Sequence, residues 1–229
     1  MPGTTITFSS EDSAQEFSAY LSPSATGSGP GIIVLQEWWG LVDHIKDIAD
    51  RFAAAGFTAL APDVYMGEST SNPDEAGKLM MALNIERTEK LLRGAVAALK
   101  GHSATAGGSV GTVGFCMGGQ LALFAACNNE AVGACVDFYG IHPAVNLNLE
   151  SLQAPVLGFF AERDGFVNAA AVTGLMSAMD EAGKRLEVHR YLDVDHAFFN
   201  DTRPDVYHEA HAQDAWQKTV AFFKAHLGD

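Results

Sequence analysis

The sequence predicts an α/β protein with a mostly parallel central sheet and helices on both faces. Short runs of apolar, largely β-branched residues alternate with amphipathic segments of helical period along the 229 residues. Continuous apolar runs are typical of strands that are covered on both faces, and strand–helix alternation is typical of parallel sheets with crossover helices. The composition, 48% hydrophobic and 18% charged, suits a sizeable core. We expect a single domain over residues 1–229.

An antiparallel hairpin is predicted at the N-terminus. The stretches TTITF (4–8) and EFSAYLS (16–22) alternate between apolar and polar residues, as half-buried strands do. The polar residues 9–15 between them are expected to form the connection.

The first parallel unit is predicted immediately after the hairpin. The apolar run IIVLQE (32–37) and the run FTALAPD (57–63) are expected to be buried strands. Between them, residues 42–56 have apolar residues at helical spacing, and Gly56 is placed to end that helix.

The alternation continues to the C-terminus. Residues 64–73 are loop-like, whereas 85–101 have the period of a helix. The remaining predicted elements are an apolar strand ending at Phe115, a helix over 120–127, strands over 131–139 and 154–162, a helix over 168–182, a strand over 185–192 and a helix near 207–226.

Charge and cysteine content exclude several classes of function. The chain has 28 acidic and 14 basic residues, a formal charge of −14, which repels nucleic acid and anionic membranes. It begins without a basic, apolar leader, so a cytoplasmic protein is expected. Its 3 cysteines match neither a disulfide framework nor a paired metal motif. We therefore expect free thiols and neither metal nor cofactor.

One cysteine occupies an unusual position in the motif GFCMGG. Cys116 lies between an apolar strand and a predicted helix, with Gly114 two residues before it and Gly118 two residues after it. This pattern is typical of a nucleophile elbow, a strained turn that places its central side chain above the sheet and at a helix N-terminus. Such a position favours the thiolate. The alternative is a small buried residue, which is the interpretation we give to Cys127 and Cys135.

The elbow predicts an acid and a histidine later in the chain, each after a strand. Asp164 follows the apolar run ending at 162, and His196 follows the strand predicted over 185–192. Glu162 is expected inside its strand, and Asp193 and Asp195 lie too close to His196 along the backbone to orient its ring. His208 and His211 are interpreted as a solvated helix face.

The stretch QEWWG ends the first parallel strand, where this architecture supplies an oxyanion-hole amide. We expect the backbone N–H groups of Trp38 and Met117 to be the two donors. Glu37 is expected to contact the thiol, because an unpaired buried carboxylate is costly; the alternative is a solvent-facing strand end. The aromatic residues near the predicted catalytic loops are candidates to line an apolar substrate pocket, or else to pack in the core: Trp38, Trp39, Tyr65, Phe198 and Phe199.

Five motifs in this order make the chain resemble the dienelactone hydrolase (carboxymethylenebutenolidase) family of α/β hydrolases. They are QEWWG, APDVY (61–65), GFCMGG, ERDGFV with Asp164, and DHAFFN with His196. The resemblance implies the α/β-hydrolase fold and a Cys116–His196–Asp164 triad. It also implies that Glu37 holds the resting thiol and helps to form the thiolate, with backbone donors at Trp38 and Met117.

The sequence departs from the family where two arginines clamp a substrate carboxylate. Residues 65–84 contain no arginine, and Asn200 occupies the position four residues beyond the histidine. Arg203 and His142 are the candidates to replace them. The resemblance implies a hydrolase of lactones or activated esters, without a nucleic-acid or membrane partner, acting as a monomer or small homo-oligomer. The alternatives are a non-catalytic small-molecule binding protein and a thiol-redox protein on the same scaffold.

Overall fold

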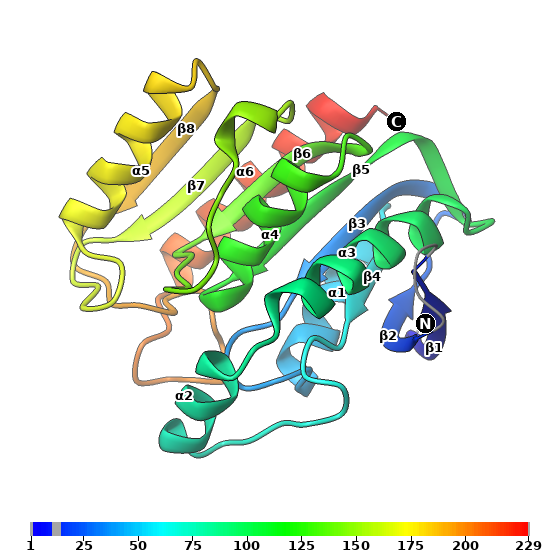
Figure 1. The fold of residues 1–229 in the computed structure, drawn as a ribbon, viewed down its shortest axis with the longest axis horizontal. Helices are drawn as coiled ribbons and strands as arrows, with labels where there is room; N and C mark the ends of the chain where they lie inside the picture. Colours follow the sequence, from blue (N-terminus) through cyan, green and yellow to red (C-terminus); the bar gives the residue numbers. More distant parts are fainter. Residues whose placement is uncertain (1, 11–14, 229) are drawn as a thin grey trace.

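The computed structural model describes residues 2–10 and 15–228 and contains a central eight-stranded sheet (Figure 1). The strands are β1 (Thr4–Ser9), β2 (Glu16–Ser22), β3 (Gly29–Leu35), β4 (Thr58–Pro62), β5 (Thr105–Phe115), β6 (Val132–Phe138), β7 (Val156–Ala161) and β8 (Leu186–Tyr191). Their spatial order is β1-β2-β4-β3-β5-β6-β7-β8.

The N-terminal strands are antiparallel and the others are parallel. β1 pairs with β2 and β2 with β4 in antiparallel register, whereas every pairing from β4 across to β8 is parallel. The predicted fold class is therefore confirmed, including the N-terminal hairpin. Part of its predicted connection, residues 11–14, lies outside the described residues.

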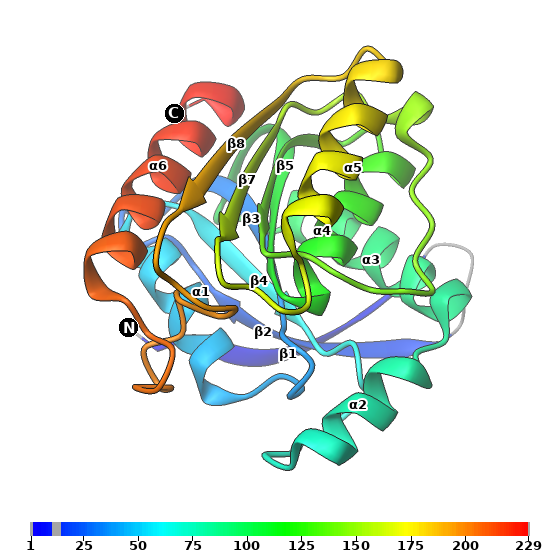
Figure 2. The same cartoon turned by 90° about the vertical axis from the view of Figure 1, so that its left-hand side faces the viewer.

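Helices cover both faces of the sheet (Figure 2). They are α1 (Asp43–Ala54), α2 (Pro73–Met81), α3 (Ile85–Lys100), α4 (Met117–Asn128), α5 (Ala169–Glu181) and α6 (Glu209–Leu227), with one short 3-10 turn at Leu149–Ser151. α1 and α6 lie on one face, and α3, α4 and α5 lie on the other. Two large buried clusters fill the spaces between these layers. Within the described residues, no helix combines the length and apolar character needed to cross a bilayer.

The boundaries of several elements differ from the prediction. α2 was not predicted, although Asn72 accepts hydrogen bonds from the Asp74 and Glu75 amides and Pro73 occupies the first turn, which are helix-start signals. α4 begins at Met117, three residues earlier than predicted, so its N-terminus lies directly at the elbow. β7 ends at Ala161, which places Glu162 after the strand rather than inside it.

The parallel strands converge at one edge of the sheet. β3, β5, β7 and β8 are neighbours or near neighbours, and Glu37, Cys116, Asp164 and His196 all follow the carboxyl ends of these strands. Because parallel strands end on the same side, the loops that carry these side chains meet there.

Candidate active site

Cys116 has strained backbone geometry. Its φ of 54° and ψ of −122° lie in a region that side chains other than glycine rarely adopt. The neighbouring glycines permit this turn: a Cβ on Gly114 would lie 1.8 Å from the Gly118 carbonyl oxygen, and a Cβ on Gly118 would lie 2.4 Å from that of Leu35. The expected strain and the need for small flanking residues are thus both present.

Backbone hydrogen bonds hold the elbow against the strand beside it. The Cys116 N–H donates to the Phe138 carbonyl at 3.0 Å, and the Cys116 carbonyl accepts from the Ile141 N–H at 3.2 Å. The same carbonyl accepts from the Gly119 N–H at 2.9 Å. The elbow is therefore tied to the loop that follows β6 as well as to its own helix.

The histidine and carboxylate predicted to support the cysteine lie together. His196 Nδ1 is 2.7 Å from Asp164 Oδ2. The other oxygen, Asp164 Oδ1, accepts from the backbone N–H groups of Phe166 and Val167, each at 2.8 Å. With three hydrogen bonds, the buried carboxylate has a fixed orientation and in turn orients the imidazole.

This arrangement shifts the protonation of the pair. Burial alone would lower the pKa of His196, but hydrogen bonds to Asp164 and Cys116, together with their charges, outweigh it and raise that pKa to about 10. Burial tends to raise the pKa of Asp164, whereas the His196 contacts and the two amide donors lower it below its ordinary value. The pair thus favours an imidazolium beside a carboxylate and next to the thiol.

Glu37 is buried at the same site, with 2% of its surface exposed, so the solvent-facing alternative is wrong. Its Oε2 accepts a hydrogen bond from Asn200 Nδ2 at 2.8 Å. Burial raises the pKa of Glu37 above its ordinary value, and Asn200, His196 and Arg203 oppose this shift only in part. Glu37 therefore binds its proton more tightly than a surface glutamate does.

The contact between Asn200 and Glu37 was not predicted from the sequence, because Asn200 was considered only as the residue that replaces a family arginine. Its own Oδ1 accepts from the backbone N–H and the hydroxyl of Thr202, at 3.1 Å and 2.6 Å. These two donors identify the amide oxygen and direct the NH₂ group toward Glu37. The sequence signal for this contact was the position of Asn200, four residues after His196.

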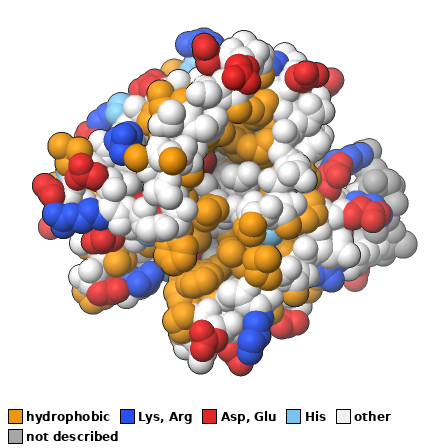
Figure 3. Space-filling view, turned by 60° about the vertical axis from the view of Figure 1, so that its left-hand side comes forward, with side chains coloured by type: hydrophobic (Ala, Val, Ile, Leu, Met, Phe, Trp, Pro, Cys, Tyr) orange, Lys and Arg blue, Asp and Glu red, His pale blue; other side chains and the backbone are white. Residues whose placement is uncertain are grey.

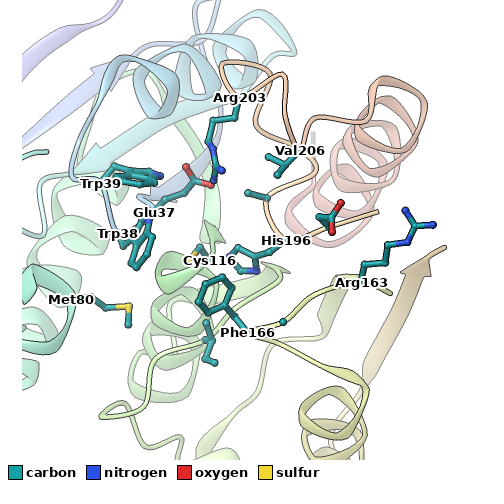
Figure 4. A pocket seen from close by; sticks show the side chains of 14 residues that line it. Glu37, Trp38, Trp39, Met80, Cys116, Arg163, Phe166, His196, Arg203 and Val206 are labelled. Carbon is teal, nitrogen blue, oxygen red and sulfur yellow. The ribbon is translucent and has the colours of Figure 1, made fainter. Parts of the chain in front are cut away.

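A cavity of about 280 Å³ opens above these side chains (Figure 4). Cys116, His196 and Glu37 line it together with Trp38, Trp39 and Phe166, and Arg203 lies on the Glu37 side. Figure 3 shows one face of the molecule on which hydrophobic side chains gather around a hollow. The cavity is mainly apolar, and its charged lining residues include Glu37, Arg163 and Arg203.

Phe166 is the most exposed aromatic residue of this wall, at 60%. Its ring lies 5.2 Å from the His196 ring and 6.2 Å from that of Trp38, measured between centroids. It was not predicted, because a phenylalanine two residues after Asp164 has no pattern that separates a cavity wall from a core position.

The predicted substrate-contact residues divide into two groups. Trp38 and Trp39 line the cavity, and the Arg203 guanidinium lies 6.0 Å from the centre of the Trp39 ring. The other four are buried away from the cavity lining: Tyr65, His142, Phe198 and Phe199. The Tyr65 hydroxyl donates to Met117 Sδ, and His142 Nε2 contacts the Met80 carbonyl. Of the two candidates predicted to bind a substrate carboxylate, Arg203 lines the cavity and His142 does not; Arg163, which was not predicted, lines it as well.

The two backbone amides predicted to form the oxyanion hole belong to Trp38 and Met117. Met117 is the first residue of α4, so its N–H has no acceptor within the helix. Trp38 follows Glu37 after β3 and also lines the cavity. Their assignment as donors remains a prediction from the sequence.

The other cysteines are unlike Cys116. Cys127 and Cys135 are free and buried. Burial raises the pKa of Cys127 to about 11 and raises that of Cys135 further. Both therefore favour the unreactive thiol. Across residues 2–10 and 15–228, no group of three or more potential ligands from His, Cys, Asp and Glu could hold a metal ion.

The strand order and the strained strand–turn–helix at Cys116 define an α/β hydrolase. A model of the "Dienelactone hydrolase family" matches residues 17–227. The chain belongs to this family and is a dienelactone hydrolase-like hydrolase, of the class that acts on carboxylic ester bonds.

Individual relatives agree with this assignment. A protein of Aquifex aeolicus, named as a candidate carboxymethylenebutenolidase, is 38% identical over 87% of this chain and 90% of its own length. The crystal structure of a candidate dienelactone hydrolase of Klebsiella pneumoniae is 29% identical, with a TM-score of 0.81 over 96% of this chain and 98% of that one. A dienelactone hydrolase-like promiscuous phosphotriesterase from metagenomic libraries has a TM-score of 0.87 over 100% of both chains, at 22% identity, and supports the fold alone.

Proposed function

We propose that the protein hydrolyses lactones or activated esters with Cys116 as the nucleophile and an acyl thioester as the intermediate. One observation carries the proposal: the His196–Asp164 pair, joined at 2.7 Å, lies beside a cysteine on a strained elbow that opens into an apolar cavity. The names of relatives add support, since the Aquifex aeolicus protein is named for the hydrolysis of such a lactone.

In the first half of the reaction, Cys116 Sγ attacks the substrate carbonyl carbon. The negative charge passes to the carbonyl oxygen, where the N–H groups of Trp38 and Met117 stabilise it by about 3 kcal/mol each. The C–O bond then breaks, and protonated His196 gives its proton to the departing oxygen. In a lactone this oxygen remains tethered to the acyl group.

In the second half, neutral His196 accepts a proton from a water molecule that attacks the thioester carbon. The C–S bond breaks, the carboxylic acid product leaves and the thiolate returns beside the imidazolium. Asp164 keeps Nδ1 protonated throughout, so that Nε2 is free for both proton transfers.

The nucleophile limits the substrates. A thiolate leaves more readily than an ordinary alkoxide or amide nitrogen, so the adduct reverts unless the leaving group of the substrate is stabilised. Enol lactones and aryl esters meet this condition, whereas peptides do not. The cavity volume of about 280 Å³ is at the lower end of ligand pockets, which favours small substrates.

Glu37 is proposed to hold the resting thiol and to accept its proton when substrate arrives. Its raised pKa supports this role, because a carboxylate with a pKa nearer to that of a thiol is a better base. Through the 2.8 Å hydrogen bond, Asn200 stabilises the carboxylate that exists before this transfer. After deacylation, Glu37 returns the proton to the Cys116 thiolate and the resting thiol is restored.

A turnover panel tests the proposal. The wild-type protein, Cys116→Ala and Cys116→Ser are compared on a dienelactone, simple lactones, p-nitrophenyl esters and peptide amides. We expect turnover of the activated esters or lactones, none of the amides, and loss of turnover by at least about 10³-fold in Cys116→Ala. Unchanged turnover in Cys116→Ala would exclude this cysteine as the nucleophile. Peroxide consumption with reversible Cys116 oxidation, in the absence of ester turnover, would favour the thiol-redox alternative.

A further inference from the structure

A further buried carboxyl group lies directly behind the elbow and has no part in the proposed reaction. Asp137 is 1% exposed and is the residue before the end of β6. In the sheet it is the register partner of Gly114, two residues before Cys116. Its side chain faces α4 rather than the cavity, as its close approach to Gly119 and Gly140 demonstrates.

Gly119 and Gly140 enclose this carboxyl group. A Cβ on Gly119 would lie 2.2 Å from Asp137 Oδ1, and a Cβ on Gly140 would lie 2.3 Å from the same oxygen. The Gly119 Cβ would also meet Gly140 Cα at 2.7 Å. The carboxyl group therefore occupies the contact between the first turn of α4 and the loop after β6, and both glycines must lack side chains to admit it.

The surroundings of Asp137 provide no compensating charge. Elements α4, β5 and β7, each described along its full length, contain no Asp, Glu, Lys, Arg or His. The titratable groups that these elements and β6 carry near Asp137 are the thiols of Cys127 and Cys135, with Cys116 at the elbow and the buried Tyr139 and His142 in the following loop. No side chain of the described residues hydrogen-bonds to either carboxyl oxygen. Burial raises the pKa of Asp137 to about 7, and the backbone N–H of Gly140 lowers it only in part.

Asp137 is mechanically connected to the nucleophile. The residues on either side of Tyr139–Gly140 form the two hydrogen bonds that hold Cys116, one from the Cys116 N–H to Phe138 and one from the Ile141 N–H to the Cys116 carbonyl. Tyr139 itself has a φ of 43°, so this short segment is strained. A change at the Asp137 carboxyl acts on Gly140 on one side and on the first turn of α4 on the other.

We propose that Asp137 is a positioning residue of the elbow, that its neutral form supports the active arrangement, and that its ionisation weakens the helix N-terminus on which the Cys116 thiolate depends. The physical reason is that a carboxylate at the first turn of α4 opposes the positive end of the helix dipole, which would otherwise stabilise the thiolate and the oxyanion. The proposal rests on the nucleophilic role proposed for Cys116.

Asp137→Asn tests this role, because the amide has the same shape and cannot ionise. We measure the alkylation rate of Cys116 by iodoacetamide, read by mass spectrometry at that residue, and kcat/KM for an aryl ester, from about pH 6 to about pH 9. The ratio of variant to wild type should rise across this range by roughly threefold to tenfold, the size expected of a charge at a helix terminus. A ratio that does not change with pH would overturn the proposal.

Thr112→Val is the matched control. Thr112 is buried on β5 under the same helix, where its hydroxyl donates to the Ala122 carbonyl at 3.1 Å. The variant disturbs this packing without removing a titratable group, so its ratio to wild type should stay constant with pH. A ratio that rises in this control as it does in Asp137→Asn would attribute the effect to packing and contradict the proposal.

A direct titration keeps the proposal testable if Asp137→Asn fails to fold or if no ester is turned over. Infrared spectra of the Glu37→Gln/Asp63→Asn double variant, from which the buried carboxyls of Glu37 and Asp63, whose pKa values are also raised, have been removed, should show a protonated carboxyl that ionises near neutral pH. Ionisation of every carboxyl group below about pH 5 would overturn the proposal. Because neither this titration nor alkylation needs turnover, a failure of the hydrolase proposal remains distinguishable from a failure of this one.

Discussion

The hydrogen bond between Glu37 and Asn200 joins the end of β3 to the loop that carries His196. A buried carboxylate with an amide partner is stabilised less than one paired with a cation, since the amide has a dipole but no charge. Asn200 is nonetheless held firmly by Thr202. The contact therefore fixes the position of Glu37 and leaves its pKa raised.

Asn200→Ala should change the pH dependence of the enzyme in a defined direction. The Asn200 hydrogen bond lowers the pKa of Glu37, so its removal raises that pKa further. The acid limb of the kcat/KM profile should then move to higher pH, and the rate at neutral pH should fall by about tenfold, the effect of a lost hydrogen bond to a charged group. Steady-state kinetics across the pH range measures both changes.

The Glu37→Gln background provides the control for this shift. There, Asn200→Ala has no ionising partner and should leave the pH profile where it was. A shift of the same size in the double variant would show that the acid limb of the kcat/KM profile reports the ionisation of another group, such as the His196–Asp164 pair.

Residues of the site were predictable where chemistry restricts their position. Cys116, Asp164 and His196 each follow a strand in the order that the elbow requires, and the structure brings the three together. Phe166 was not predictable, because its exposure depends on where the loop after Asp164 turns. Phe198 and Phe199, close to His196 in sequence, point into the core instead. Proximity along the chain does not determine the direction of a side chain.

At the level of elements, the junction of β5 and α4 is the most constrained part of the site. Gly118→Ala would place a Cβ 2.4 Å from the Leu35 carbonyl oxygen, and this atom belongs to backbone. We expect a loss of about 2 kcal/mol in the free energy of unfolding. Activity should fall as well, because the displaced segment leads to Glu37 and Trp38. Urea unfolding and ester turnover measure these two effects.

Gly174→Ala is the corresponding control. Gly174 lies in α5, where an added Cβ would meet no atom within 4 Å. The variant should gain about 0.5 to 1 kcal/mol through helix propensity and should keep its activity. Equal stabilities for the Gly118 and Gly174 variants would contradict the steric account of the elbow.

The element boundaries illustrate which signals the sequence carries. The helical period of residues 85–101 sufficed to predict α3, since its buried residues recur at that period. α2 has one fully buried residue, Ala76, while Leu79 and Met80 pack against the core only in part, so its apolar face is short. Its clearest signal is the cap at Asn72 and Pro73. The start of α4 was predicted too late because the glycines at 118 and 119, poor helix formers, lie within its first turn.

On the scale of the whole molecule, charge is unevenly balanced. The formal charge of −14 implies repulsion between surface carboxylates, whereas individual exposed ion pairs contribute little. Raising NaCl from about 10 mM to about 300 mM should therefore raise the melting temperature, because screening weakens the net repulsion. Differential scanning calorimetry measures this change, and a fall in melting temperature would mean that the ion pairs dominate.

The overall architecture was predictable from alternation alone, but the order of the strands was not. Apolar runs and helical periods identify strands and helices, whereas the placement of β4 between β2 and β3 depends on long-range pairing. The antiparallel hairpin packs against β4, so the chain returns to the N-terminal side before it crosses to β5. No local sequence pattern predicts this order of strands.

Detection of the acyl intermediate tests the central claim most directly. The wild-type protein is mixed with an aryl ester, quenched in acid within the first turnover and digested for mass spectrometry. The account predicts that the mass of Cys116 increases by that of the acyl group. In His196→Gln this acyl-enzyme should accumulate, because deacylation slows. In Cys116→Ser no thioester should form. Steady turnover with the acyl group on another residue, or on none, would contradict it.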